Sequence, residues 1–214
     1  MNQFSEEFFQ AVPVIGILRG YPLEKTLNIV EAYYQAGFRT IEITMNTPQV
    51  DTILKTLVKE YGGRLNIGAG TVCNAVDLEV ALNAGAQFIV SPIVDIDLIK
   101  QCKALNIPVF PGAYTATEIY QAWTAGARMV KLFPASDLGP AYVKNVLAPL
   151  NQIEIMPTGG VSLENIVAYR KAGAKAFGMG SLLFDKALVE AEDWVRLTAK
   201  LKTVFSLINK KLDV

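Results

Sequence analysis

The sequence contains no histidine among its 214 residues. Histidine is the side chain that most often serves as a general base near neutral pH and as a ligand of zinc-type metals. Any acid–base chemistry must therefore use carboxylates, lysine, tyrosine, cysteine or water. We expect no metal site and no metal cofactor.

Cysteine, net charge and long apolar runs are scarce as well. The only two cysteines, Cys73 and Cys102, lie in unrelated contexts and suggest neither a metal knuckle nor a disulfide framework, which fits a reducing, cytoplasmic location. Lys and Arg total 20, as do Asp and Glu, so charge gives no reason to expect nucleic acid or an anionic membrane as partner. No apolar run approaches membrane-spanning length, and the acidic start MNQFSEEFFQ predicts no signal peptide.

The residues that are present favour one folded domain. Apolar residues make up 51% of the chain and charged residues 19%, a composition that supports a large core and argues against disorder. No linker or low-complexity segment interrupts the sequence. We therefore expect residues 1–214 to form a single domain.

An Ala-Gly pair recurs between helix-like stretches and short apolar runs. The segments are AGFRTIEI from Ala36, AGAQFIVSP from Ala84, AGARMVKLFP from Ala125 and AGAKAFGMGS from Ala172. The glycine of each pair suits the left-handed position that follows a helix C-terminus. The repeats therefore mark helix-to-strand joints in a parallel β/α protein.

Strands and helices are predicted to alternate along the whole chain. Predicted strands are Val14–Leu18, Arg39–Thr44, Leu65–Gly68, Gln87–Ser91, Pro108–Phe110, Met129–Leu132, Glu154–Met156 and Ala176–Met179. Predicted helices are Asn2–Gln10, Leu23–Gln35, Gln49–Tyr61, Ala75–Asn83, Asp95–Leu105, Ala116–Thr124, Ala141–Leu147, Leu163–Lys171 and Phe184–Asn209. This alternation predicts an α/β fold, a single (β/α)8 TIM barrel with a short N-terminal helix. A doubly wound open sheet is the alternative, although no GxGxxG fingerprint follows the first strand.

Lys131 lies in the apolar run RMVKLFP, residues 128–134. Strand alternation puts Lys131 on the same face as Met129 and Phe133, and Pro134 ends the strand because it has no N–H to donate. Burial disfavours the charged amine and lowers its pKa, and only a neutral amine attacks a carbonyl. A lysine that snorkels from a strand end to water is the plainer interpretation.

Glu42 lies inside the predicted strand IEIT, and alternation places it opposite the two isoleucines. Because the isoleucines suit contact with helices, Glu42 is expected to point into the barrel. A buried carboxylate is costly unless it is paired or functional. We expect its carboxylate within direct or one-water hydrogen-bond reach of the Lys131 amine, although a structural ion pair is the alternative.

Glycines cluster after the last two predicted strands, at Gly159-Gly160 and at Gly178-Met179-Gly180-Ser181. In (β/α)8 enzymes these two loops often bind phosphate through backbone N–H groups. An internal lysine, an internal carboxylate and a phosphate cradle together suit Schiff-base chemistry on a phosphorylated keto compound. A phosphosugar isomerase or epimerase, or a non-catalytic phosphate-binding barrel, would use the same fold.

The motifs VIGILRG, IEITMNTP, IGAGTV, VSP, FPGAYTATE, VKLFPAS, PTGGV and GMGSLL occur in this order. Together they resemble the class I 2-keto-3-deoxy-6-phosphogluconate (KDPG)/4-hydroxy-2-oxoglutarate (KHG) aldolase family over nearly the whole chain. The resemblance implies cleavage of a 2-keto-3-deoxy-6-phospho sugar acid to pyruvate and glyceraldehyde 3-phosphate through a lysine imine. It implies no metal and a homotrimer, and KHG cleavage to pyruvate and glyoxylate is a further activity of the family.

The resemblance also assigns roles to individual residues. Lys131 matches the Schiff-base lysine, and Glu42 the general acid/base. Thr71 matches the ligand of the pyruvate carboxylate. The phosphate site is expected at Gly160, Gly180 and Ser181, and the pocket lining at Pro92 and Phe133.

One position departs from the phosphogluconate type, whose members often carry an arginine in the loop after the second strand. This sequence has Asn46 there and carries Arg19 after the first strand instead. The combination is more similar to the 6-phosphogalactonate branch. We expect Arg19 to hold the substrate carboxylate together with Thr71, since a guanidinium matches two oxygens, and Asn46 to bond a hydroxyl.

Overall fold

The computed structural model describes residues 3–212, and the side chains of residues 3–210. A strand forms at every place where the sequence predicts one. The strands are β1 Val14–Leu18, β2 Thr40–Thr44, β3 Asn66–Gly70, β4 Ile89–Val90, β5 Val109–Phe110, β6 Gly112–Ala113, β7 Val130–Leu132, β8 Ile155–Pro157 and β9 Phe177–Met179. β5 falls within the predicted strand Pro108–Phe110, whereas β6 lies beyond it and was not predicted. Pro111 separates the two strands because it has no N–H for a ladder.

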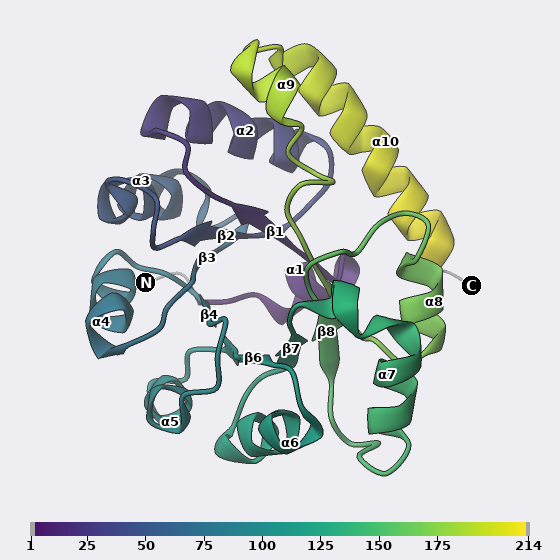
Figure 1. Ribbon diagram of the computed structural model, residues 1–214. Helices are drawn as coiled ribbons and strands as arrows, with labels where there is room; N and C mark the ends of the chain where they lie inside the picture. Colours follow the sequence, from purple (N-terminus) through teal and green to yellow (C-terminus); the bar gives the residue numbers. More distant parts are fainter. Residues whose placement is uncertain (1–2, 213–214) are drawn as a thin grey trace.

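All strand pairs are parallel, and the strands form two sheets. The larger sheet has the order β5-β4-β3-β2-β1-β9, and the smaller one the order β6-β7-β8. An isolated parallel bridge joins Thr158, which directly follows β8, to Gly178 of β9. Figure 1 shows the strands grouped at the centre with helices around them. The architecture is therefore a parallel α/β fold of the TIM type rather than a doubly wound sheet.

The helices follow the strands and cover their outer side. They are α1 Glu6–Ala11, α2 Leu23–Gln35, α3 Val50–Tyr61, α4 Ala75–Asn83, α5 Ile96–Ala104, α6 Ala116–Ala125, α7 Gly139–Leu147, α8 Ile166–Lys171, α9 Lys186–Glu190 and α10 Trp194–Leu212, with a 3-10 turn, η1, at Ala135–Asp137. Side-chain caps fix several starts. Thr115 forms a capping box with Glu118 at α6, and Asn74 accepts a hydrogen bond from Asp77 N at α4.

The prediction of one helix over Phe184–Asn209 is wrong. The segment contains α9 and α10, which are separated at Ala191–Asp193. Glu192 has a left-handed backbone, with φ 54°, and the Asp193 side chain accepts a hydrogen bond from Arg196 N at 3.0 Å. A capping aspartate therefore starts a second helix, which the continuous apolar periodicity concealed.

Other helix starts also differ from the prediction. α1 begins at Glu6 because the Ser5 side chain caps it, accepting from Phe8 N at 3.2 Å, and Asn2 of the predicted helix lies outside the described residues. α7 begins earlier than expected, at Gly139 with Pro140 in its first turn. α8 begins later, at Ile166.

The predicted Ala-Gly joints are confirmed. Gly37, Gly85, Gly126 and Gly173 all have left-handed φ angles, from 88° to 115°. Each glycine follows a helix and lets the chain turn into the next strand without the steric penalty of a Cβ atom. A side chain at Gly37 would also meet the Phe205 ring of α10, 2.8 Å from its built Cβ.

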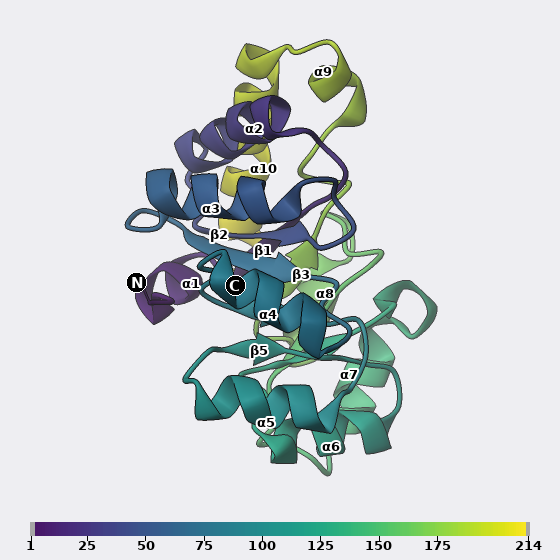
Figure 2. The same cartoon turned by 90° about the vertical axis from the view of Figure 1, so that its left-hand side faces the viewer.

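Two hydrophobic clusters hold the fold together. The larger one lies between strands and helices. The smaller one comprises Phe9, Ile15, Phe88, Val90, Phe110, Met129, Met156 and Ala176, with Phe4 packed against it. Figure 2 shows α1, which carries Phe9, at one end of the strands. Phe9 belongs to the smaller cluster, so α1 covers that end of the strands with an aromatic side chain.

Polar contacts fasten α1 to the strands. Arg128, which precedes β7, donates to Glu6 of α1 at 2.7 Å and also to Glu154. Asn66 of β3 accepts from Ser5 N at 2.7 Å and donates to Ser5 O at 2.9 Å. Among the described helices, none has the length and apolar character needed to cross a membrane.

Candidate active site

The opposite ends of the strands surround a cavity of about 240 Å³. Its lining includes the predicted site residues Arg19, Glu42, Thr71, Pro92, Lys131, Phe133, Gly160, Gly180 and Ser181. These residues come from seven different strands or the loops after them. Side chains predicted separately along the sequence therefore meet in one place, as the barrel interpretation required.

Lys131 lies in the middle of β7, where it pairs with Gly112 of β6 and Met156 of β8. Its exposed fraction is 6%, so the snorkelling interpretation is wrong for this lysine. Burial lowers the pKa of the amine, Glu42 opposes that effect, and the positive charge of Arg19 adds to it. The Nζ atom lies 4.9 Å from the centre of the Phe133 ring. Burial thus favours the neutral form of the Lys131 amine, which is the form that can attack a carbonyl.

Glu42 lies on β2 and has an exposed fraction of 1%. Burial raises the pKa of its carboxyl group, whereas Lys131 and Arg19 act to lower it. Among the described residues no donor reaches its buried Oε2 atom. In the same part of the chain, no ion pair within 4.0 Å joins it to Lys131. The carboxyl group therefore lies in the same cavity as the amine without forming an ion pair with it.

Thr71 directly follows β3 and has a left-handed backbone with φ 62°. This conformation is unfavourable for a β-branched residue, so the surrounding structure must impose it. Val72 N donates to Val90 O at 3.1 Å, which anchors the turn to β4. The strain at Thr71 indicates that this turn is held in a particular shape beside the cavity.

The loop after β8 carries Gly159 and Gly160, with φ 81° and 84°. Asn165 holds this loop by donating to Gly160 O at 2.8 Å and accepting from Ser162 N at 2.8 Å. A side chain at Gly160 would meet Ser136, 2.7 Å from its built Cβ. The glycines thus allow a close backbone approach beside Gly180 and Ser181, which also line the cavity.

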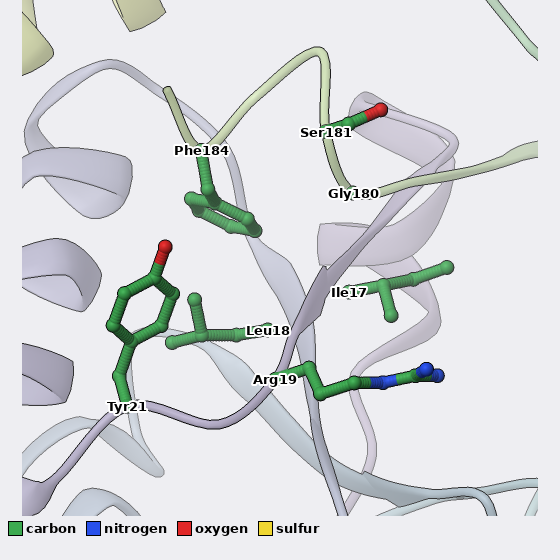
Figure 3. A pocket seen from close by; sticks show the side chains of 7 residues that line it. All are labelled: Ile17, Leu18, Arg19, Tyr21, Gly180, Ser181 and Phe184. Atoms are coloured by element: carbon green, nitrogen blue, oxygen red, sulfur yellow. The ribbon is translucent and has the colours of Figure 1, made fainter. Parts of the chain in front are cut away.

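A second cavity, of about 260 Å³, adjoins the first and shares Ile17, Arg19, Gly180 and Ser181 with it. Figure 3 shows the Arg19 side chain extending away from Tyr21 and Phe184, on the same side as Ile17. The guanidinium therefore points out of the second cavity. No described residue forms an ion pair with Arg19.

Asn46 is the predicted site residue that the structure places elsewhere. Its side chain is exposed in the turn after β2 and is not part of the cavity lining. Sequence analysis in turn missed the role of Thr158, a buried residue that lines the cavity. A Cβ atom at Gly178 would lie 2.2 Å from the Thr158 Oγ1 atom. The signal was present, because Thr158 lies just after the predicted strand Glu154–Met156 and directly before the double glycine.

The model of the KDPG and KHG aldolase family matches residues 6–200. The chain belongs to this family. It is 37% identical over 174 residues to the 2-dehydro-3-deoxy-6-phosphogalactonate aldolase of Escherichia coli K12, covering 81% of this chain and 85% of that protein. Membership of an aldolase family agrees with the resemblance seen in the sequence motifs.

Solved structures of aldolases share the fold of this family member. A native KDPGal structure superposes with a TM-score of 0.88 at 32% identity, covering 99% of this chain and all of that one. The KDPG aldolase of Legionella pneumophila has a TM-score of 0.82 at 27% identity, over 92% of this chain and 96% of that one. That aldolase was captured with pyruvate as a covalent carbinolamine.

Proposed function

We propose that this protein is a class I aldolase that cleaves a 2-keto-3-deoxy-6-phospho sugar acid to pyruvate and glyceraldehyde 3-phosphate. The observation that carries the proposal is the buried Lys131 amine, with its lowered pKa, in one cavity with the Glu42 carboxyl group, whose Oε2 atom meets no donor among the described residues. A neutral amine beside a proton carrier is what imine formation needs. The carbinolamine of the Legionella relative supports the same chemistry.

The reaction begins when the neutral Lys131 amine attacks the C2 ketone and forms a carbinolamine. Glu42 delivers the proton with which the C2 oxygen leaves as water, and a protonated imine results. Glu42 then accepts the C4 hydroxyl proton while the C3–C4 bond breaks. The electron pair of that bond moves into the imine. Glyceraldehyde 3-phosphate departs, and the enamine left on Lys131 is protonated at C3 and hydrolysed to pyruvate, which frees the amine.

Substrate binding follows from the lining of the cavity. Arg19 and Thr71 hold the carboxylate, because a guanidinium offers two parallel donors to two oxygens. Gly160, Gly180 and Ser181 hold the phosphate, with Ser181 donating through its hydroxyl. Pro92 and Phe133 form apolar walls, and Phe133 limits the access of water to Lys131. We propose KHG cleavage as a further activity, in which the same residues act on this smaller keto acid.

The imine takes the role of electron sink, so the reaction needs no metal. No group of three or more metal-ligating side chains gathers in the described part of the chain. Cys73 and Cys102 are free thiols, which is consistent with a cytoplasmic enzyme.

We further propose that the strands close into one (β/α)8 barrel and that residues 1–214 form one domain. Supporting closure, Lys175 N donates to Ile155 O at 3.0 Å across the gap between β8 and β9. At the other gap, only Pro111 separates β5 from β6. For the assembly we propose a homotrimer, which fits the exposure of the apolar side chains Val76, Ile93, Tyr114 and Tyr120. Light scattering of the purified protein measures the trimer directly.

Covalent trapping tests the proposed function. Incubation with pyruvate and borohydride, in the presence of a chelator, should add the mass of one reduced pyruvyl group to the peptide that contains Lys131. Lys131→Met is the matched control and should gain nothing. An isomerase, an epimerase or a non-catalytic barrel would give no adduct, and an adduct on another lysine would overturn the assignment of Lys131.

A further inference from the structure

Gly70, at the end of β3, lies directly against the carboxyl group of Glu42. A Cβ atom built on Gly70 would lie 2.3 Å from Glu42 Oε2, 2.4 Å from Cδ and 2.7 Å from Oε1. Real Cβ atoms do not approach other heavy atoms so closely. The carboxyl group therefore occupies the space that any other residue at position 70 would need for its side chain.

The backbone does not explain the glycine. Gly70 lies inside a regular parallel strand, paired with Thr44 of β2, and its φ is not in the left-handed region. An alanine would therefore suit the conformation of β3, and the clash with Glu42 is the obstacle to it. The space beside Cα of Gly70 serves the carboxyl group rather than the chain.

The space beside Cα of Gly70, called the slot below, determines which charged groups the Glu42 carboxyl group can contact. Charged groups that face Glu42 are Lys131 from β7 and Arg19 from the loop after β1, and both act on its charge through the cavity. Leaning on β3, the carboxyl group forms no ion pair with Lys131 within 4.0 Å, and no donor within residues 3–210 reaches its Oε2 atom. A carboxyl group displaced from β3 would move into the cavity, towards these two cations.

We propose that Gly70 is a positioning residue, which keeps the Glu42 carboxyl group on β3 and away from the Lys131 amine. This proposal rests on the aldolase function proposed above. By preventing a direct ion pair, the slot leaves Lys131 free to be a neutral nucleophile. It also leaves one carboxyl oxygen available for protons of the substrate rather than for the lysine.

A double-mutant cycle tests the proposal. Gly70→Ala should lower kcat/KM about a hundredfold, the loss expected when a reacting group moves by about 1 Å. The pH profile of pyruvate trapping should shift to higher pH, because a carboxylate nearer to Lys131 raises the pKa of the amine. In a Glu42→Asp background the carboxyl group is one methylene shorter and withdraws from the slot. Gly70→Ala should then change kcat/KM by no more than about twofold.

Gly68→Ala is the matched control on the same strand and face. The nearest atoms to a Cβ atom at Gly68 would be those of the Phe88 ring, at 2.4 Å, rather than the Glu42 carboxyl group that Gly70 faces. This variant should lose thermal stability without shifting the pH profile, and Glu42→Asp should not rescue it. If Gly70→Ala behaves in the same way, or if the losses at positions 42 and 70 simply multiply, the proposal is overturned.

A measurement without substrate separates this proposal from the proposed function. The Glu42 carboxyl carbon, followed by 13C NMR and assigned by its loss in Glu42→Gln, should titrate at lower pH in Gly70→Ala than in the wild type. An unchanged titration contradicts the positioning role. If the wild type traps no pyruvate, the aldolase function fails, while this titration still decides how Gly70 places the carboxyl group.

Discussion

At the scale of single residues, the site combines two buried groups whose pKa values move towards each other. Burial lowers the pKa of Lys131 and raises that of Glu42, because it disfavours the charged form of each group. A neutral amine and a protonated carboxyl group are the forms that attack a ketone and release water. Both groups cost folding free energy, and this cost makes their removal measurable.

Lys131→Met should abolish trapping and stabilise the protein. The native state binds the Lys131 proton less tightly than the unfolded chain, so wild-type stability rises with pH between the lowered native pKa and the ordinary one. An apolar side chain removes this penalty. We expect the gain at neutral pH to be about 1.4 kcal/mol for each unit by which the native state lowers the pKa of Lys131. Urea unfolding across pH measures the gain, which should shrink as the pH approaches the ordinary pKa of lysine.

Glu42→Gln should keep the fold and lower the rate of cleavage by about a hundredfold or more, the usual contribution of a general acid/base. Because the native pKa of Glu42 is raised, wild-type stability falls as the pH rises through that pKa. The amide carries no charge and removes this fall. A variant that cleaves at the wild-type rate would show that another group moves the protons.

At the scale of helices and strands, α1 closes the amino ends of the strands with aromatic rings. The Phe9 ring lies 5.6 Å from that of Phe110, and Phe4 lies 5.5 Å from Phe88, centre to centre. The stem of Lys131 lies on the cavity side of this apolar cluster, since Met129 is two residues before it on the same strand face. α1 therefore contributes to the apolar surroundings of the Lys131 side chain.

Phe9→Ala should cost about 3–5 kcal/mol of unfolding free energy, the usual loss for a buried aromatic ring. Glu6→Ala removes the ion pair to Arg128 on the same helix and should cost no more than about 1 kcal/mol, because the pair is partly exposed. Denaturant unfolding compares the two variants. Equal losses would mean that the ion pair, rather than the rings, holds α1 in place.

The strand positions and the inward direction of Lys131 and Glu42 could be predicted because strand alternation has a strict period of two. The break between α9 and α10 could not, since apolar spacing continues through Ala191–Asp193 and the backbone of Glu192 carries no sequence signal of its own. Asn46 lies in the turn just after β2. The direction of its side chain depends on the backbone dihedral angles of that turn, which strand alternation does not determine. The slot at Gly70 depends on a contact between two strands, which one segment of sequence cannot reveal.

At the scale of the whole molecule, the cavity is assembled from both halves of the chain. Arg19 follows β1, whereas Gly180 and Ser181 follow β9, and β1 and β9 are paired in the larger sheet. α10 also packs against α2 beside these strands. The residues proposed to hold the two charged ends of the substrate, Arg19 with Gly180 and Ser181, thus lie where the start and the end of the chain meet.

Substrate preference tests the role of Arg19 in this arrangement. We expect measurable cleavage of the phosphogalactonate epimer, and a loss of about 2–5 kcal/mol in transition-state binding for both epimers in Arg19→Ala, if the charge pair is desolvated. Asn46→Arg serves as the comparison, because position 46 lies outside the cavity lining. Unchanged kcat/KM in Arg19→Ala would reduce Arg19 to a surface charge. Cleavage of only the gluconate epimer would contradict the galactonate assignment and leave the aldolase function intact.

The pairing of β1 with β9 has a consequence for the newly made protein. A ribosome releases the lysine and the carboxylate of the site well before Gly180 and Ser181, so a chain interrupted before β9 holds the reactive groups without the phosphate-binding loop. In such a chain β1 lacks the neighbour that β9 provides, so β1 remains an edge strand. In the proposed binding mode, a substrate held by Arg19, Gly180 and Ser181 bridges the two ends of the polypeptide. Substrate binding to the folded state would then oppose unfolding at the pairing of β1 with β9.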